Sequence, residues 1–305
     1  MGLGEWIGRL FGGKSQDRGG SVAPGRLVLV ELSARLGVSV AELQAARVEY
    51  AQFTVPKRRG GQRKISAPSD GLKTLQRRIL YRLLGRLKSH PTVQGFERGR
   101  SIVTNAVPHV GRAVVLRMDI RDFFPTTTAK RVEMYFRRTG WDAESAALLT
   151  RLCTHEGGLP QGAPTSPRLS NLVNHPMDAR LEALAATAGA TYTRYADDLT
   201  FSLPQDTPGT TARLIGSTKA ILRSYGYRLH QDKKLRIWRR HDRQMVTGLV
   251  VNERANLPRR LRRKLRAIEH HLLTGRPATL TADQLNGWKA LQNMVDAQAL
   301  PPAQE

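Results

Sequence analysis

The sequence is short of cysteine, of aromatic residues and of acidic residues, and these shortages exclude several classes of protein. A single cysteine among 305 residues excludes an internal disulfide framework and any zinc site built from clustered cysteines, and we expect this residue, Cys153, only to be packed. No run approaches the roughly 20 apolar residues that a membrane-spanning helix needs. The first residues also lack the charged start and long apolar run of a secretory signal. We therefore expect a cytoplasmic chain with no membrane partner.

Acidic residues are outnumbered two to one by basic residues. Lys and Arg total 49 against 25 Asp and Glu, which makes the formal net charge +24. Such an excess attracts polyanions, so nucleic acid is the first partner to consider and an anionic membrane the second. Two stretches hold much of the charge: residues 57–64 contain five basic residues, and residues 254–266 contain seven and no acid.

The spacing of apolar residues predicts an α+β chain with helices at both ends. We expect two short helices around Gly37 and a β-hairpin with its tip at Gly60-Gly61. An amphipathic helix over 70–89, with Asp70 as its N-cap, and a strand ending at Asp119 should follow. Further helices are predicted at 128–139, 141–153, 167–188, 210–225 and 257–305, and strands within 191–203 and 227–251. Helices and strands do not alternate strictly, which argues against a doubly wound parallel sheet.

The scarce carboxylates include three at the ends of predicted strands. Asp119 follows one strand, and Asp197 and Asp198 lie together at a tight turn between two others. Adjacent carboxylates repel each other unless a cation neutralises them, and clustered carboxylate oxygens suit Mg²⁺. Two Mg²⁺ ions at such a site can support phosphoryl transfer. An isolated Asp-Asp pair is more often a solvated turn or a helix cap, so the surrounding residues must decide.

Those surroundings resemble a reverse transcriptase. MDIRDFFP at 118–125, GGLPQGAPTSPRLSNL at 157–172 and YADDLTFS at 195–202 are similar to three motifs of that family, in the same order. The resemblance extends from about Ala51 to Asn252. NAVPH at 105–109 and VTG at 246–248 resemble patterns of the retron subgroup.

The resemblance implies a fold and an activity. The fold is the right hand of polymerases: fingers and a palm with an antiparallel sheet over 49–252, a basic helical thumb over 253–305, and an N-terminal helical extension over 1–48. The activity is RNA-directed DNA polymerisation by a retron enzyme. Such an enzyme recognises a structured noncoding RNA, primes from the 2′-hydroxyl of an internal guanosine and makes branched single-stranded DNA (msDNA). Retrons act in antiphage defence, usually with a separate effector protein.

Other functions stay open at this point. Diversity-generating or CRISPR-associated reverse transcriptases are alternatives, although the NAVPH and VTG strings argue against them. A scaffold that binds RNA and restrains a toxin, with catalysis incidental, belongs to a different class of protein. An RNA-dependent RNA polymerase is a weaker rival.

The resemblance also implies roles for residues at the catalytic centre. Asp119, Asp197 and Asp198 would bind two Mg²⁺ ions, with the backbone carbonyl of Ile120 as a further ligand. Lys233 aligns with the lysine that protonates the departing pyrophosphate. The nucleotide-binding residues would be Arg63 and Lys64 at the triphosphate, backbone amides of Asp122 and Phe123, and Gln161 and Gly162 near the base and sugar. Phe124 would exclude the ribose 2′-hydroxyl and so select dNTPs, and one of the two phenylalanines would serve core packing alone.

Nucleic-acid contacts are expected at three places. Lys57 and Arg58 lie in the hairpin tip, where a solvated basic turn is an equal alternative for each residue. Asn105 and His109 lie in the NAVPH string, where a structural role is favoured for the histidine. In the C-terminal helix, leucines repeat on one face, and the opposite face carries the basic residues Arg259, Arg262, Arg263 and Arg266.

Overall fold

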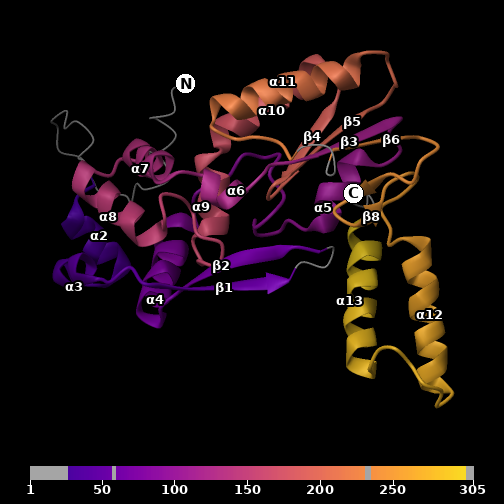
Figure 1. Cartoon of the computed structure of the whole chain (residues 1–305), viewed down its shortest axis with the longest axis horizontal. Coiled ribbons are helices and arrows are strands. Elements are labelled where there is room, and N and C mark those ends of the chain that lie inside the picture. The colour runs from indigo at the N-terminus through magenta and orange to yellow at the C-terminus, as the bar shows by residue number, and fades with distance from the viewer. Residues whose placement is uncertain (1–26, 57–59, 231–234, 300–305) are drawn as a thin grey trace, which may run out of the picture. The chain divides into compact units, whose positions relative to one another are not determined.

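The computed structural model describes residues 27–56, 60–230 and 235–299, and Figure 1 shows its helices and strands. Contacts divide the chain into two compact units, each made of two stretches. The first comprises residues up to Leu87 together with Thr127–Leu169, and the second comprises Lys88–Thr126 together with Ser170 onward. Among the described residues, no helix is both long enough and apolar enough to cross a membrane.

The first unit joins a hairpin to short helices. α2 (Leu29–Leu36) ends at Gly37, whose φ of +62° breaks it from α3 (Val40–Ala45), as predicted. β1 (Tyr50–Pro56) and β2 (Gln62–Pro68) pair antiparallel, which confirms the hairpin. The other elements are α4 (Asp70–Arg78), the π-helix η1 (Ile79–Leu84), α7 (Ala129–Arg138) and α8 (Ala143–Cys153).

The second unit contains a four-stranded antiparallel sheet in the order β4-β5-β3-β6. Its strands are β4 (Thr191–Tyr195), β5 (Asp198–Leu203), β3 (Val114–Asp119) and β6 (Arg236–Arg239). The other elements are α5 (Ile102–Ala106), η2 (Val107–His109), α6 (Phe123–Thr126), α10 (His175–Thr187), α11 (Thr210–Ser224), β7 (Met245–Val246), β8 (Leu249–Val250), α12 (Arg259–Leu273) and α13 (Ala282–Ala299). The mixed helix and sheet content confirms the α+β class, with antiparallel sheets.

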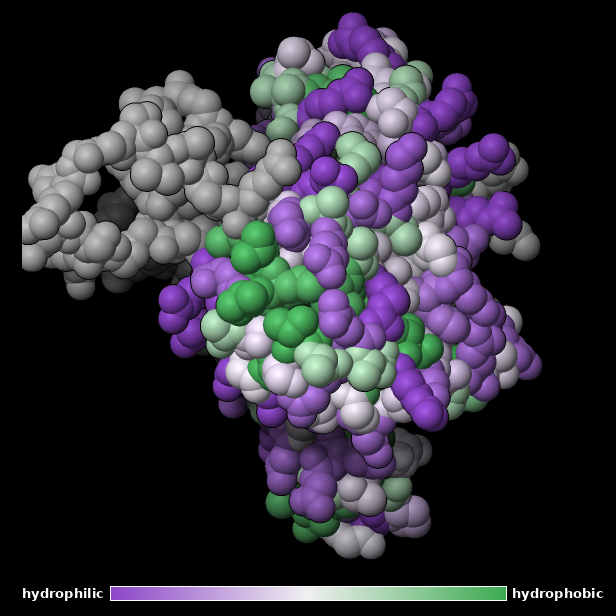
Figure 2. All heavy atoms as spheres, turned by 90° about the vertical axis from the view of Figure 1, so that its left-hand side faces the viewer, coloured by the Kyte–Doolittle hydropathy of each residue, from purple (hydrophilic) through white to green (hydrophobic). Residues whose placement is uncertain are grey.

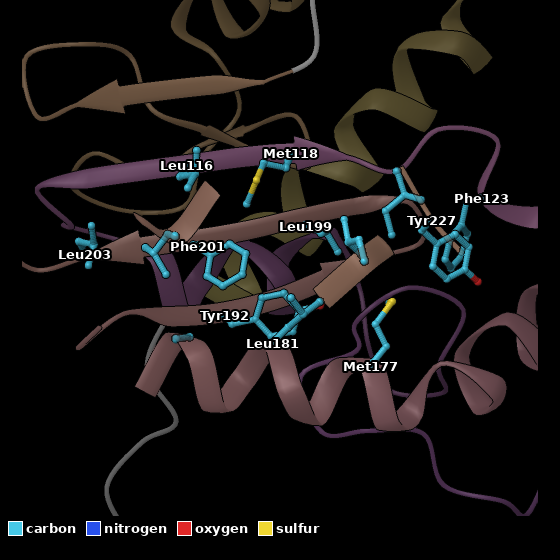
Figure 3. Close-up of a cluster of buried hydrophobic side chains, with 14 of the residues drawn as sticks. Leu116, Met118, Phe123, Met177, Leu181, Tyr192, Leu199, Phe201, Leu203 and Tyr227 are labelled. Carbon is cyan, nitrogen blue, oxygen red and sulfur yellow. The ribbon is translucent and has the colours of Figure 1, made fainter. Parts of the chain in front are cut away.

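The two faces of this sheet carry different residues, because side chains alternate along a strand. Leu116 and Met118 of β3 point into a core that α10 and α11 also line, and Figure 3 shows Met177 and Leu181 of α10 turned toward the sheet. Val115 belongs instead to a second core with residues of β7, β8, α12 and α13. By this alternation Asp119 shares the face of Val115, opposite to the core with α10.

Two sequence predictions about helices need correction. The helix expected over 167–188 is two helices, α9 (Ser166–Val173) and α10, which are separated at Asn174. Pro176 lies in the first turn of α10, where its missing N–H is tolerated, whereas it would remove a hydrogen bond inside a continuous helix. The N-cap of α4 is Ser69 rather than Asp70, which lies in the first turn.

Figure 2 draws one face of the molecule, where hydrophilic side chains are widespread and hydrophobic side chains gather mainly in one area. Cys153, by contrast, is fully buried, and burial raises the pKa of its thiol to about 12. The prediction that this cysteine is packed in the interior is confirmed.

Candidate active site

Two of the predicted catalytic carboxylates lie opposite each other on adjacent strands of the sheet. Asp119 is the last residue of β3, Asp198 is the first of β5, and the register pairs them directly. Side chains of directly opposed residues lie on the same face, with Cβ atoms about 5 Å apart. Asp119 is buried, with 5% of its surface exposed, and Asp198 is half-buried. The fold therefore brings these two carboxylates together, and their catalytic role stays a prediction.

The turn that holds Asp197 is strained and is attached to the end of β3. Ala196 and Asp197 connect Tyr195 of β4 to Asp198 of β5. Ala196 has a φ of +56°, a left-handed conformation that favours glycine. The carbonyl oxygen of Asp197 accepts a hydrogen bond of 2.9 Å from the amide of Ile120. All three predicted carboxylates thus belong to two backbone segments that are joined to each other.

Basic side chains lie next to the acid pair. Arg117, two residues before Asp119 on the same face, donates from Nε to Asp198 Oδ1 at 2.9 Å and from Nη2 to Oδ2 at 2.5 Å. His230 Nε2 lies 3.7 Å from Asp119 Oδ1, and the His230 amide donates to the Asp119 carbonyl. The guanidinium of Arg117 offsets the repulsion between two adjacent carboxylates.

The donor set at the acid pair suits a hard divalent cation. Carboxylate and backbone carbonyl oxygens are the ligands that Mg²⁺ takes. A carboxylate offers roughly four lone-pair positions, so Asp198 can accept from the Arg117 fork and also ligate a cation. Among the described residues, no three His, Cys, Asp or Glu side chains are grouped so as to hold a metal ion. The site as it stands is a carboxylate pair with an arginine counter-ion.

Comparison with known proteins shows the family to which the chain belongs. The family described as "Reverse transcriptase (RNA-dependent DNA polymerase)" matches residues 55–242. The Retron Ec86 reverse transcriptase of Escherichia coli is 34% identical over 89% of this chain and 85% of its own length. The chain belongs to the retron reverse transcriptases. The prediction of that family from the motifs is confirmed.

Two relatives from Myxococcus xanthus extend the comparison. The Retron Mx162 and Retron Mx65 reverse transcriptases are each 38% identical to this chain over 87% of its residues. The chain spans 63% of the length of the first and 68% of the second. Membership is therefore shown for the family, and the activity and partners of this reverse transcriptase are proposed below.

The residues after Asp119 divide between the surface and the core. Asp122 is exposed, with a φ of +47°, and Arg121 Nε donates to its Oδ2 at 3.2 Å. Phe123 is buried at 3% exposure and packs near Tyr227 (Figure 3). Phe124 is only half-buried, with its ring centroid 6.2 Å from that of Phe96. Phe123 is thus the phenylalanine that serves packing, which leaves Phe124 as the candidate for contact with the sugar.

The predicted nucleotide-binding residues of the first unit lie on the hairpin and the PQG turn. The carbonyl of Gln161 accepts from the amide of Ser66 in β2 at 2.8 Å. Gly162 has a φ of +134°, and a Cβ there would lie 2.7 Å from the Ser66 carbonyl oxygen. The close approach that Gly162 permits in the structure is therefore to β2 itself. Arg63 and Lys64 lie in the exposed part of β2.

Sequence reasoning missed a carboxylate that holds Lys64. Glu156, in the loop after α8, accepts from Lys64 Nζ at 3.1 Å and from Gln52 Nε2 at 2.7 Å. The hydrogen bonds from Gln52 and Lys64 lower the pKa of Glu156. No motif marks this glutamate, since the contact depends on a loop 92 residues away from Lys64.

Two predicted RNA contacts do not fit the structure. The side chain of His109 is fully buried, with Nδ1 2.7 Å from Ser202 Oγ and Nε2 2.8 Å from Thr193 Oγ1. Asn105 is 1% exposed, and its Nδ2 lies 3.4 Å from Thr247 Oγ1. Neither side chain reaches the surface, which agrees with the structural role favoured for His109 and indicates a structural role for Asn105 as well. The two residues tie the NAVPH segment to the sheet and to the VTG turn.

Replacing His109 by Gln is expected to flatten the acid dependence of stability. Burial, with a smaller contribution from Arg112, lowers the pKa of His109 to about 3, below the ordinary value of 6.5. The unfolded chain then binds more protons between these values. Stability is present above about pH 6.5 and falls toward pH 3, with a slope of up to about 1.4 kcal/mol per pH unit.

Urea unfolding from pH 7 to pH 4 measures this slope. His109→Gln should be less stable at pH 7 but lose less stability on acidification. His90, whose pKa burial also lowers, is unchanged in the variant and does not affect the difference. Parallel curves for the two proteins would contradict the assignment.

The remaining predicted nucleic-acid contacts are basic residues, of which some lie in α12 and others lie outside the described residues. Leu265 and Ile268 of α12 are buried in the second core. Of the basic residues that we predicted to contact nucleic acid, Arg259, Arg263 and Arg266 are exposed, whereas Arg262 is half-buried and its Nε atom is buried. Lys57, Arg58 and Lys233 lie outside the described residues.

Gly95 is a further residue that the motifs did not indicate. The Gln94 amide donates to the Arg194 carbonyl at 2.8 Å, so the segment before Gly95 runs beside β4. A Cβ on Gly95 would lie 2.9 Å from the backbone nitrogen of Ala196. This separation is shorter than two such atoms tolerate, so a side chain here pushes against the turn that carries Asp197.

Gly95→Ala is therefore expected to lower the rate of primer extension by about 10-fold, because displacement of catalytic groups by a fraction of an ångström has large kinetic effects. Gly216→Ala in α11 is the matched control, since open space surrounds Gly216 and alanine favours a helix. Equal activity of the two variants in a steady-state extension assay would show that the turn is not displaced.

Proposed function

We propose that this chain is an RNA-directed DNA polymerase of a retron. The observation that carries the proposal is the pairing of Asp119 with Asp198 at adjoining strand ends, within the segment that the family matches. Paired carboxylates on joined backbone segments are suited to hold divalent cations against a polyphosphate. We also propose that the chain is arranged as fingers and palm over 49–252 and a thumb over 253–305, as predicted from the sequence.

Each residue of the site has a proposed task. Asp119, Asp197 and Asp198, with the carbonyl of Ile120, would hold two Mg²⁺ ions. When bound, these ions supply the positive charge that activates an attacking hydroxyl and stabilises the leaving oxygen. The half-buried ring of Phe124 lies against the sugar 2′ position and selects dNTPs.

The remaining tasks rest on the resemblance alone. Amides of Asp122 and Phe123 bind the triphosphate, and Lys233 acts as a general acid toward pyrophosphate. Arg63, Lys64, Gln161 and Gly162 of the first unit bind the incoming nucleotide.

The retron assignment adds a specific substrate and product. We propose that the chain recognises a structured noncoding RNA, primes from the 2′-hydroxyl of an internal guanosine and releases msDNA that remains branched from the RNA. The relatives named as retron reverse transcriptases support this, as does the basic face of α12, which suits sequence-independent contact with a duplex backbone. A role in antiphage defence with a separate effector protein follows from the same resemblance.

The test examines nucleic acid that copurifies with the chain when it is expressed from its native locus. After RNase digestion, the remainder is run with and without debranching enzyme. A discrete short DNA that shifts on debranching is expected, and it should be absent from an Asp197→Asn, Asp198→Asn double variant. The same DNA from the double variant would refute the proposed site.

Two other results would change the function. If the chain extended an added primer–template but copurified with no DNA, it would still be a reverse transcriptase. The proposal of a structured retron RNA as its substrate would then be rejected. If the double variant still bound RNA and kept the full biological function of the parent, the chain would be a scaffold rather than an enzyme.

A further inference from the structure

A fully buried ion pair lies in the second unit, at the end of β4 that leads into the Ala196–Asp197 turn. Arg194 of β4 and Asp178 of α10 are both 0% exposed. Arg194 Nε donates to Asp178 Oδ1 and Nη2 donates to Oδ2, each at 2.7 Å. This bidentate geometry fixes the orientation of the guanidinium, and the carboxylate balances its charge.

The third nitrogen of Arg194 reaches the turn itself. Nη1 donates to the carbonyl oxygen of Ala196 at 3.0 Å and to Asn171 Oδ1 at 3.2 Å. The guanidinium carbon also lies 5.4 Å from the ring centroid of Phe123. Since Ala196 adopts a φ of +56°, a hydrogen bond to its carbonyl supports a conformation that alanine does not prefer.

Arg194 lies on the opposite face of the sheet from the acid pair. Tyr192, two residues earlier on β4, belongs to the core that α10 lines, and Arg194 shares its face by alternation. The acid pair lies on the other face with Val115. Arg194 therefore cannot touch a substrate, and in the described part of the chain it is linked to the acid site through the backbone of the turn.

The charge on Arg194 persists at every working pH. Burial by itself would lower the pKa of the guanidinium, but the charge and hydrogen bonds of Asp178 outweigh burial and keep the pKa above its ordinary value. A buried pair of this kind contributes little net stability compared with apolar side chains of similar size. Stability alone therefore does not account for an arginine at this position.

We propose that Arg194 is a positioning residue of the polymerase, which holds the turn bearing Asp197 and Asp198 through the carbonyl of Ala196. The inference rests on the proposed function, because it concerns the same site. Asp178 orients the guanidinium, and Asn171 sets the direction of the nitrogen that meets the turn.

Two variants separate positioning from folding. Arg194→Lys keeps the charge beside Asp178, but a single ammonium cannot bond to Asp178, Asn171 and Ala196 together. The triple variant Asp178→Leu, Tyr192→Phe, Arg194→Met removes the pair and also the Tyr192 hydroxyl that donates to Asp178 at 2.9 Å. Because no partner is left as an unpaired buried charge, the triple variant should fold. Arg239→Lys is the matched control, since Arg239 pairs with Asp206 at an exposed site.

The expected result is a selective loss of turnover. Both variants should show the circular dichroism of the parent, with kcat for primer extension reduced about 10- to 100-fold. At saturating Mg²⁺, KM for dNTP and Kd for the RNA should stay within about twofold, because neither depends directly on the turn carbonyl. Arg239→Lys should match the parent in all three quantities.

Binding of Mn²⁺ alone, measured by electron paramagnetic resonance, gives a readout that needs no polymerisation. Arg194→Lys should bind Mn²⁺ about 10-fold more weakly than the parent. A parent chain that binds Mn²⁺ but makes no DNA would refute the proposed function, and the Mn²⁺ affinities of the parent and of Arg194→Lys would still test whether Arg194 holds the turn.

Two outcomes would overturn the positioning role. A folded Arg194→Lys or triple variant with the kcat and Mn²⁺ affinity of the parent would show that the turn does not need Arg194. Failure of both variants to fold would make Arg194 a residue of folding only.

Discussion

Replacing Asp198 by Asn is expected to lower the rate of DNA synthesis by about 10³-fold or more. Asparagine keeps the shape of the side chain but removes the negative charge that would hold a divalent cation opposite Asp119. Loss of several kcal/mol of transition-state stabilisation corresponds to a rate decrease of this size. Asp119→Asn should have the same effect, because the two carboxylates are directly paired. Single-turnover primer extension with dNTPs and Mg²⁺ measures it.

The same substitution should leave the fold intact. In the Asp198→Asn variant the side-chain carbonyl still accepts a hydrogen bond from Arg117, so the guanidinium keeps a hydrogen-bond acceptor. Circular dichroism and RNA binding should match the parent chain. Asp206→Asn is the control, since it removes one carboxylate of an exposed pair in the same unit. An Asp198→Asn variant within threefold of the parent rate would show that the acid pair is not the catalytic centre.

Phe124→Ala is expected to admit ribonucleotides. The ring of Phe124 is half-buried against Phe96 and Phe123, so it has a fixed position at the edge of the core. A rigid ring beside the sugar excludes a 2′-hydroxyl by steric overlap, and its removal should reduce the preference for dNTP over rNTP by about 100-fold. The ratio of kcat/KM values for the two nucleotides measures the preference.

Phe123→Ala provides the matched comparison, because the two phenylalanines are neighbours with different burial. Phe123 is inside the core, and its truncation should cost about 3–5 kcal/mol of stability while the nucleotide preference stays unchanged. Phe124→Ala should show the opposite pattern, with a smaller loss of stability. A Phe124→Ala variant that still rejects ribonucleotides would remove the steric assignment.

Local sequence determined the elements and the family. Gly37 ends one helix, Gly60-Gly61 directly precedes the second hairpin strand, and the apolar spacing of β3 predicts a strand that ends at Asp119. Each depends on residues within a few positions of one another, so propensity and turn chemistry are sufficient. The three motifs identified the family for the same reason, since each is a continuous stretch of residues.

Tertiary structure decided which groups surround the site. Arg117 meets Asp198 because β3 pairs with β5, and His109 is buried because Ser202 and Thr193 lie against it. The order and register of the strands determine these contacts, and no local pattern of residues encodes them. The sequence thus predicted which carboxylates form the candidate site of this reverse transcriptase. Only the packing of α10, β4 and the turn decided that Arg194 lies buried behind them, because a buried charge depends on a partner that the fold brings to it.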